Sequence, residues 1–266
     1  MKREMRGFIL VAVALLGWST AAAADEQPIC ADRPRKSTGV CTVPDGRTQI
    51  EIGLIDWTRD RSGGETSELT SFGSTQVKYG IGPNADIELG ITPIETLTIR
   101  DGGREHHSSF GDTILRVKYR LTREDAPVEV AVDPFVKLPT ANHQLGNGKV
   151  EGGLLVPVSA QIGKGPWTLS FDPELDLLAD SDGLGRHLAT LQVVNLGLQV
   201  NQQLSLSAEI WGMWDWDPAG TGRQRSGDVS AAYLVGKNVQ LDAGANFGLN
   251  RQTPDVELYT GVSVRF

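Results

Sequence analysis

Apolar and polar residues alternate along most of this chain, and this pattern constrains its fold more than any other feature. In 127–138, for example, Val128, Val130 and Val132 share one face, while Glu129 and Asp133 lie on the other. Successive side chains of a β-strand point to opposite faces, so each such stretch predicts a strand. Twelve stretches show the pattern, and no helical periodicity interrupts them after residue 24. They are 48–57, 69–79, 85–99, 111–121, 127–138, 150–162, 167–179, 188–200, 204–216, 228–235, 239–249 and 256–266.

The connectors between these strands decide between two architectures. Alternation alone fits a soluble sandwich, with apolar residues inside, and a membrane barrel, with apolar residues facing lipid. Short turns such as "GPN" at 82–84 and "GKGP" at 163–166 alternate with longer loops such as "PTANHQLGNGK" at 139–149. Bacterial up-and-down barrels have this asymmetry, with short periplasmic turns and longer outer loops. We therefore predict an all-β fold, a 12-stranded antiparallel up-and-down transmembrane β-barrel of the bacterial outer membrane.

Aromatic residues are sorted by the kind of connector that they adjoin. Those near the end with short turns are Tyr79, Tyr119, Trp167, Tyr233 and Phe266, and those near the longer loops are Trp57, Trp214, Trp216 and Phe247. Aromatic belts at both membrane–water interfaces are typical of transmembrane barrels. The aromatics of a soluble core would have no reason to sort in this way, so they support the barrel.

The N-terminus reads as an export signal, residues 1–24. A basic start precedes an apolar run of about 12 residues, which is too short to span a bilayer as a helix. Ala22 and Ala24 have the A-x-A spacing of a cleavage site, so we expect cleavage after Ala24. The mature chain would then consist of an N-terminal periplasmic segment at 25–45 and the barrel at 46–266.

Both cysteines, Cys30 and Cys41, lie in the segment 25–45. An even number of cysteines in an exported chain predicts a disulfide, with metal binding or free thiols as the alternatives. The segment is long enough to enter the barrel from the periplasmic side. We expect it to plug the lumen in part, held by the Cys30–Cys41 bond.

The lumenal face of the predicted barrel carries charges of both signs. A barrel of 12 strands is intermediate in size between 8-stranded barrels, which side chains fill, and barrels of 16–18 strands, which hold an aqueous pore. Opposed basic and acidic stripes would orient a polar solute, as rings of charge do in other pores, or would pair across the lumen and close it. Both readings remain open from the sequence. The residues that we assign to the lumen and the solute path are Arg116, Lys118, Arg120, Glu129, Asp133, Glu151, Asp172, Glu174, Asp176 and Glu209.

Other kinds of chemistry are weakly represented. The chain has 33 Asp and Glu against 25 Lys and Arg, a formal net charge of −8, which gives no support for nucleic-acid binding. Neither a phosphate-binding nor a dinucleotide motif occurs, so we expect no cofactor. His106 to Ser109 place histidine beside serine without an orienting group, so we do not expect an enzyme. All four histidines fall in predicted outer loops: His106, His107, His143 and His187. They are either ordinary surface residues or ligands of a metal site in the loops.

Several longer segments can be compared with known families. They include "KSTGVCTVPDGRTQIEIGLIDWTRDRSGG", "SSFGDTILRVKYRL", "GNGKVEGGLLVP" and "GANFGLNRQTPDVELYTGVSVRF". From about Cys30 to Phe266 the chain resembles a bacterial outer-membrane family assigned as transporters of the meta-cleavage pathway of phenol degradation. That resemblance implies a barrel that acts as a channel or uptake protein. The ending also resembles the signal read by the barrel-insertion machinery, carried here by Tyr259, Val262, Val264 and Phe266.

These observations lead to a functional expectation with an explicit alternative. We expect an outer-membrane channel or facilitator for passive uptake of small solutes, hydrophobic or aromatic ones included. Its partners would be outer-membrane lipids, the barrel-insertion machinery and a small-molecule solute. The alternative is a non-transporting structural or adhesive barrel with a closed lumen, and flux assays in liposomes separate the two. A soluble exported β-protein, third in order, would fractionate without detergent.

Overall fold

The computed structural model describes residues 28–266, so the predicted signal peptide and its cleavage site lie outside the described residues. The described chain folds as one antiparallel sheet of 15 strands. Its strands are β1 (Thr48–Ser62), β2 (Glu65–Gly82), β3 (Ala85–Ile91), β4 (Ile94–Arg100), β5 (Glu105–Ser109), β6 (Thr113–Arg120), β7 (Glu129–Leu138), β8 (Glu151–Leu155), β9 (Val158–Gln161), β10 (Trp167–Ala179), β11 (Arg186–Gln199), β12 (Leu204–Asp215), β13 (Gly222–Leu234), β14 (Val239–Gly248) and β15 (Val256–Arg265).

These elements make 12 spanning strands, because three spanning strands are each interrupted once. Both β3 and β4 pair with β2, while β6 pairs with β3 and β5 with β4. Likewise β8 and β9 both pair with β7 and β10. Two of the interruptions fall at Pro93 and Pro157, which have no N–H to donate to the ladder. The predicted 12-stranded antiparallel barrel is confirmed.

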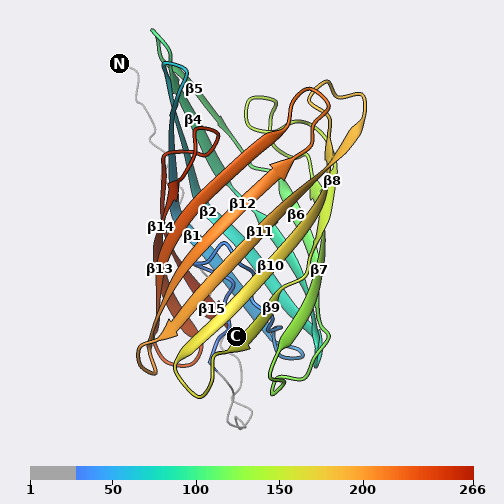
Figure 1. Ribbon diagram of the computed structural model, residues 1–266, viewed down its shortest axis with the longest axis vertical. Coiled ribbons are helices and arrows are strands. Elements are labelled where there is room, and N and C mark those ends of the chain that lie inside the picture. Colours follow the sequence, from blue (N-terminus) through green and yellow to red (C-terminus); the bar gives the residue numbers. More distant parts are fainter. Residues whose placement is uncertain (1–27) are drawn as a thin grey trace, which may run out of the picture.

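The two ends of the barrel sequence close the ring. β1 pairs with β2 on one side and with β15 on the other (Figure 1). At this seam the Phe266 N–H donates to the Thr48 carbonyl oxygen at 2.8 Å. Closure matters because lipid offers no hydrogen bonds to an open strand edge. Within β1 the register shifts between Gly53 and Ile55, and Leu54 and Ile55 are both exposed on the outer wall.

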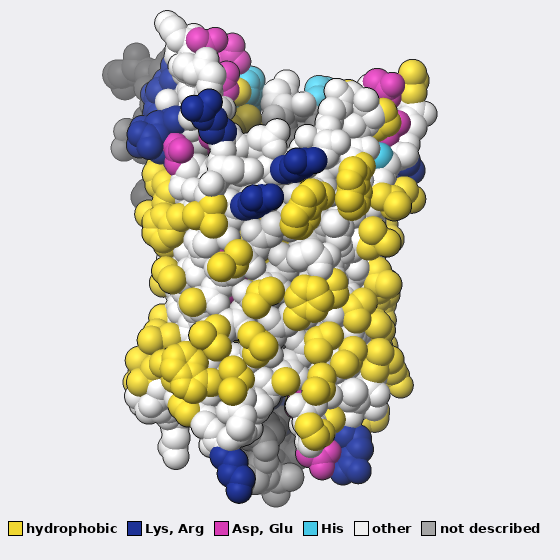
Figure 2. Space-filling view, in the orientation of Figure 1, with side chains coloured by type: hydrophobic (Ala, Val, Ile, Leu, Met, Phe, Trp, Pro, Cys, Tyr) yellow, Lys and Arg dark blue, Asp and Glu magenta, His cyan; other side chains and the backbone are white. Residues whose placement is uncertain are grey.

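Side chains are distributed in the reverse of a soluble protein. Large apolar side chains cover the outer wall, among them Ile210 and Leu206, which are 66% and 41% exposed. Charged side chains such as Lys118, Asp133 and Glu51 are buried inside. Figure 2 shows the hydrophobic side chains as a broad band on the wall, with charged side chains gathered above and below it. Such a band is suited to lipid contact.

The two ends of the barrel differ, as the connectors predict. The short-turn end carries the turns β2–β3, β6–β7, β9–β10, β11–β12 and β13–β14; the long-loop end, at the top of Figure 1, carries the others. Exposed aromatics occur at both: Tyr79, Tyr119 and Trp167 near short turns, Trp216 and Phe247 near long loops. Between residues 28 and 266, no helix is long and apolar enough to cross a membrane.

The C-terminal strand places the predicted assembly signal on two faces. Val262 and Val264 alternate with Ser263, which is fully buried, and Phe266 is 58% exposed at the short-turn end. Tyr259 faces the lumen instead, where the Arg33 guanidinium lies 6.0 Å from its ring centroid. A role of these residues in assembly remains a prediction.

Deletion of Phe266 is expected to lower severalfold the amount of folded barrel in the outer membrane. The change removes an exposed aromatic side chain and the 2.8 Å hydrogen bond that joins β15 to the start of β1. The measurement is the heat-modifiable band in outer-membrane fractions on gels. Phe266→Tyr, which keeps the ring and the backbone, is the control. Assembly of the deletion variant at the control level would show that the ending has no such role.

Candidate functional site

The N-terminal plug, defined here as residues 28–47, lies inside the barrel, where Figure 1 shows it in blue behind β10 and β11. The Cys30–Cys41 disulfide joins its two limbs, with the Cα atoms 6.4 Å apart. Within this loop the Gly39 N–H donates to Oδ1 of Asp32 at 2.8 Å. The plug contains no helix and, before residue 48, no ladder strand. Most of its backbone N–H groups therefore need partners from the barrel wall.

Glu209 on β12 binds the tip of the plug. Its carboxylate accepts the backbone N–H groups of Lys36 and Ser37 at 2.8 and 3.1 Å, and the Ser37 hydroxyl at 2.5 Å. The Asn195 side-chain amide on β11 donates to the same carboxylate at 2.9 Å. Hydrogen bonds to a charged acceptor are the stronger kind, so this buried carboxylate is well satisfied.

Glu51 on β1 binds the plug from another side of the barrel. Its carboxylate accepts the N–H groups of Asp32 and Arg33 at 3.2 and 3.0 Å. The Gln49 side chain donates both to Glu51, at 2.9 Å, and to the carbonyl oxygen of Cys30, at 3.1 Å. One wall carboxylate thus fixes the plug just after its first cysteine.

Two further carboxylates complete the attachment around the barrel. Asp172 on β10 accepts the Thr38 N–H at 2.5 Å, and Asp86 on β3 accepts the Val43 N–H at 2.7 Å. The four acceptor carboxylates belong to β1, β3, β10 and β12, which lie on different sides of the ring. The plug is therefore bonded to the wall in several directions, as expected of a segment that fills the lumen and not of one that lies against one wall.

Asp32 makes the densest ion-pair cluster in the lumen. Its carboxylate contacts the ammonium groups of Lys78 on β2 and Lys118 on β6, the latter at 2.8 Å. Glu51 and Glu88 lie 2.7 Å from Lys78 and 3.4 Å from Lys118, respectively. Burial by itself disfavours the charged carboxylate, but Lys118 and Lys78 outweigh it and hold the pKa of Asp32 well below its usual range. Asp32 therefore stays charged.

Two more charged side chains of the plug reach the wall on the β14–β15 side. The Arg33 guanidinium contacts Oδ1 of Asp242 at 3.0 Å. The Lys36 ammonium contacts Oε2 of Glu257 at 3.1 Å. Arg33 also accepts a hydrogen bond at its carbonyl oxygen from the Gln240 side chain, at 2.9 Å. Acidic and basic side chains of the plug thus both form ion pairs with the wall.

The ten residues assigned from the sequence to the solute path have different surroundings. Lys118, Asp172 and Glu209 bind the plug, as described above. Arg116 lies 3.4 Å from Asp133 on the neighbouring strand.

The remaining members of that set lie along the wall away from the plug contacts. Lys137 lies 2.8 Å from Glu151, and Arg120 lies 2.8 Å from Glu124 in the short turn. The others are buried or half-buried on the strands: Glu129, Glu174 and Asp176. Contact of any of the ten with a solute stays a prediction.

Several lumenal residues escaped the sequence analysis. Glu51, Lys78, Glu88 and Asp242 are all buried and lie in the ion-pair clusters around the plug. The alternation that selected Lys118 contains the same signal for them: Lys78, for instance, stands between the outward Val77 and Tyr79. The partners on the plug carry no such signal, because an irregular segment has no periodicity.

The plug leaves a cavity on each side. The first, about 260 Å³, lies toward the short-turn end, as its lining by Gln199, Ser205 and Gln240 shows. It shares these residues with a wider hollow of about 570 Å³ at the short turns. The second cavity, about 290 Å³, lies on the far side of the plug and is lined by residues such as Thr92 and Arg116. Arg33 and Arg35 line both cavities, so the plug separates two compartments of one lumen.

The histidines lie at the long-loop end. The "HHSS" run is on β5, where Nδ1 of His106 lies 3.0 Å from the Thr98 hydroxyl. His187 lies between the carboxylates of Asp180 and Asp215, at 2.9 and 2.7 Å. In the part of the chain that the structure describes, no group of three or more His, Cys, Asp and Glu is placed to hold a metal ion.

Solved structures with the same fold are outer-membrane barrels. The COG4313 outer-membrane channel from Pseudomonas putida F1 matches with a TM-score of 0.67 at 14% identity, over 85% of this chain and 97% of that one. The NanC porin matches with a TM-score of 0.52 at 12% identity, over 82% of this chain and 98% of that one. The translocator domain of the autotransporter NalP from Neisseria meningitidis matches with a TM-score of 0.53 at 13% identity, over 84% of this chain and 90% of that one. The TM-scores establish a common fold despite the low identities, so the chain has the closed antiparallel barrel fold of these outer-membrane proteins.

The sequence relationship is more specific than the shared fold. No curated protein matches the chain. One family model does, and it covers residues 31–266, which include the plug from Ala31 onward and the entire barrel. The chain therefore belongs to the family described as "Putative MetA-pathway of phenol degradation".

Proposed function

We propose that this protein is an outer-membrane channel for passive passage of small solutes, with the N-terminal plug as its constriction. The observation that carries the proposal is the pair of cavities, about 260 and 290 Å³, on the two sides of the plug. A barrel built only as a scaffold has no need of polar compartments along its axis. The short-turn end, which holds the C-terminus, would face the periplasm, as in other bacterial barrels.

The plug limits the size of the solute. An apolar cavity of about 150 Å³ is large enough to bind benzene, so 260–290 Å³ admits a molecule of one ring with substituents. The family description and the cavity size together suggest single-ring aromatic compounds, the hydrophobic or aromatic class expected from the sequence. The linings carry many polar groups, so a ring that bears a polar substituent fits better than a bare hydrocarbon.

We propose no catalytic role. The histidine and serine candidates lie on β5 at the long-loop end, away from both cavities. His106 bonds to Thr98, a hydroxyl that cannot replace the carboxylate of a catalytic triad. Many of the charged side chains in the lumen pair with the plug or with one another, as a constriction requires.

Liposomes that contain the purified protein are expected to swell in isotonic arabinose and not in raffinose, which is three sugar rings long. Liposomes without protein give the baseline. Slower arabinose entry in the presence of phenol, at concentrations that leave the vesicles intact, would support single-ring aromatics as solutes. The absence of both swelling and ion current would leave the alternative, a structural or adhesive barrel closed by its ion pairs.

A further inference from the structure

We propose that the cavity on the short-turn side of the plug binds the carboxylate group of a small organic monoanion, with Arg35 as its main ligand. This inference deepens the proposed channel function and rests on it for the role of the site in uptake. Binding itself can be measured without transport.

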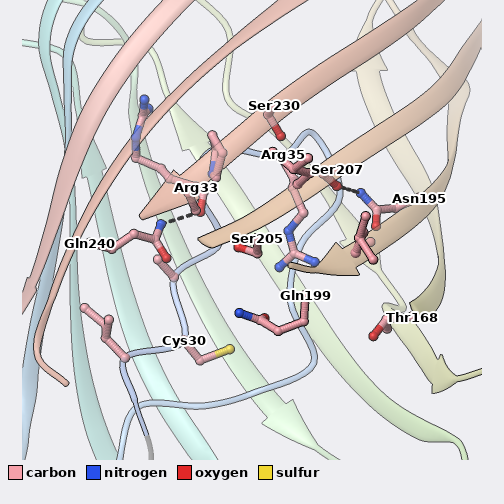
Figure 3. A pocket seen from close by; sticks show the side chains of 17 residues that line it. Cys30, Arg33, Arg35, Thr168, Asn195, Gln199, Ser205, Ser207, Ser230 and Gln240 are labelled. Carbon is pink, nitrogen blue, oxygen red and sulfur yellow. Dashed lines mark hydrogen bonds between the residues drawn. The ribbon is translucent and has the colours of Figure 1, made fainter. Parts of the chain in front are cut away.

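Arg35 differs from the other charged residues in the same stretch of the plug. Asp32, Arg33 and Lys36 each have an ion-pair partner on the wall. Within residues 28–266, the Arg35 guanidinium has no hydrogen bond and no carboxylate partner. Figure 3 shows its side chain pointing into the cavity, between Ser205 and Gln199, whereas that of Arg33 points away. A half-buried guanidinium without an anion is an unused binding group, since its five N–H donors fit a carboxylate.

The cavity is free of acidic side chains although the chain as a whole carries a net charge of −8. None of the described residues that line it is Asp or Glu, whereas Asp32, Glu51 and Asp112 line the cavity across the plug. Glu209, behind the lining residue Asn195, is saturated by the donors of the plug. Among the residues that the structure describes, no acidic side chain that lines this cavity therefore competes with a ligand for Arg35.

Hydroxyl groups provide further donors. The Ser230 hydroxyl is buried and has no hydrogen-bond partner among the described residues. Ser205 and Thr168 also line the cavity. The amides around them are already used: Figure 3 shows that Asn195 donates to Ser207 and Gln240 to the Arg33 carbonyl. Asn195 also donates to Glu209. A buried hydroxyl without a partner is costly, and a ligand oxygen would satisfy it.

The rest of the lining favours an organic body on the anion. Ile29, Ala31, Pro34 and Ala232 form a buried apolar part of the same cavity. A single guanidinium balances a single negative charge, so a monoanion suits the site better than inorganic phosphate, which carries up to two. A volume of about 260 Å³ accommodates one ring or a short chain beside the carboxylate. Benzoate is a suitable probe.

The test is titration calorimetry of benzoate against the full mature protein in detergent. Arg35→Gln is expected to weaken benzoate binding by about tenfold or more, because it removes a charge-assisted pair. Arg35→Lys should retain part of the affinity, since it keeps the charge and loses the fork. Arg123→Gln, the same change in an exposed turn where Arg123 pairs with Asp125, should leave binding unchanged. The Arg35 side chain forms no hydrogen bond or ion pair with the described residues, so neither Arg35 variant should alter folding.

The ligand class is tested by two further probes. Benzyl alcohol, which has the ring without the charge, should bind much more weakly than benzoate, and inorganic phosphate should not displace benzoate. Equal binding by wild type and Arg35→Gln, no binding by folded wild type, or displacement by phosphate would each overturn the assignment. Arabinose swelling in the same preparations keeps the two proposals apart: swelling without benzoate binding refutes only the site, and binding without swelling refutes only the channel.

Discussion

Removal of residues 25–45 is expected to raise the single-channel conductance of the protein severalfold in planar bilayers. The plug fills the cross-section between the cavities and is bonded to β1, β3, β10 and β12. Without it, the lumen of a 12-stranded barrel would be continuous, and its width would be set by wall side chains alone. The barrel itself should survive, because its ladder is complete from Thr48 to Arg265.

The control for this deletion separates loss of the plug from general damage. Shortening the β12–β13 loop, which lies at the long-loop end, removes residues without touching the plug and should leave conductance near wild type. Both proteins must first show the heat-modifiable band of a folded barrel. An unchanged conductance in a folded deletion variant would mean that the plug does not limit the path, and the proposed constriction would fail.

The fold was largely predictable because the architecture of a membrane barrel is reflected in local sequence patterns. Alternation indicates the strands, connector length distinguishes the two ends of the barrel, and both signals come from neighbouring residues. Irregularities were harder to predict. The bulge at Gly53–Ile55 in β1 shifts the outward face by one position, and the sequence shows only two adjacent apolar residues, Leu54 and Ile55, at that point.

The site was predictable only in part, since its contacts join residues that are far apart in the chain. Alternation put Glu209 and Asp172 on the lumenal face, but it could not reveal that the partner of each is a backbone N–H of the plug, more than 130 positions away. An acidic stripe that binds a plug and one that faces a solute show the same alternation in the sequence. Nor does "DRPRK" distinguish Arg35 from Arg33, because the difference lies in which wall residues stand opposite each side chain.

Asp32→Ala is expected to loosen the plug, seen as frequent excursions to a higher conductance level in single-channel recordings. The substitution leaves the buried Lys78 and Lys118 with Glu51 and Glu88 alone, and removes the acceptor of the Gly39 N–H. Breaking a buried ion pair by removal of one partner typically costs about 3–5 kcal/mol. Since the two lysines keep other carboxylates nearby, we expect the lower part of that range for docking of the plug.

Two comparisons identify the cause of this effect. Asp45→Ala, at an exposed position of the same segment, removes an equal charge and should leave the recordings unchanged. Asp32→Ala combined with Lys118→Met should recover part of the closed time, because replacing both partners no longer leaves Lys118 buried without its strongest counter-charge. If Asp32→Ala alone behaves as wild type, the ion-pair cluster is not what holds the plug. The plug would then depend on its disulfide and on the wall carboxylates that bind its backbone, which Glu209→Gln would test next.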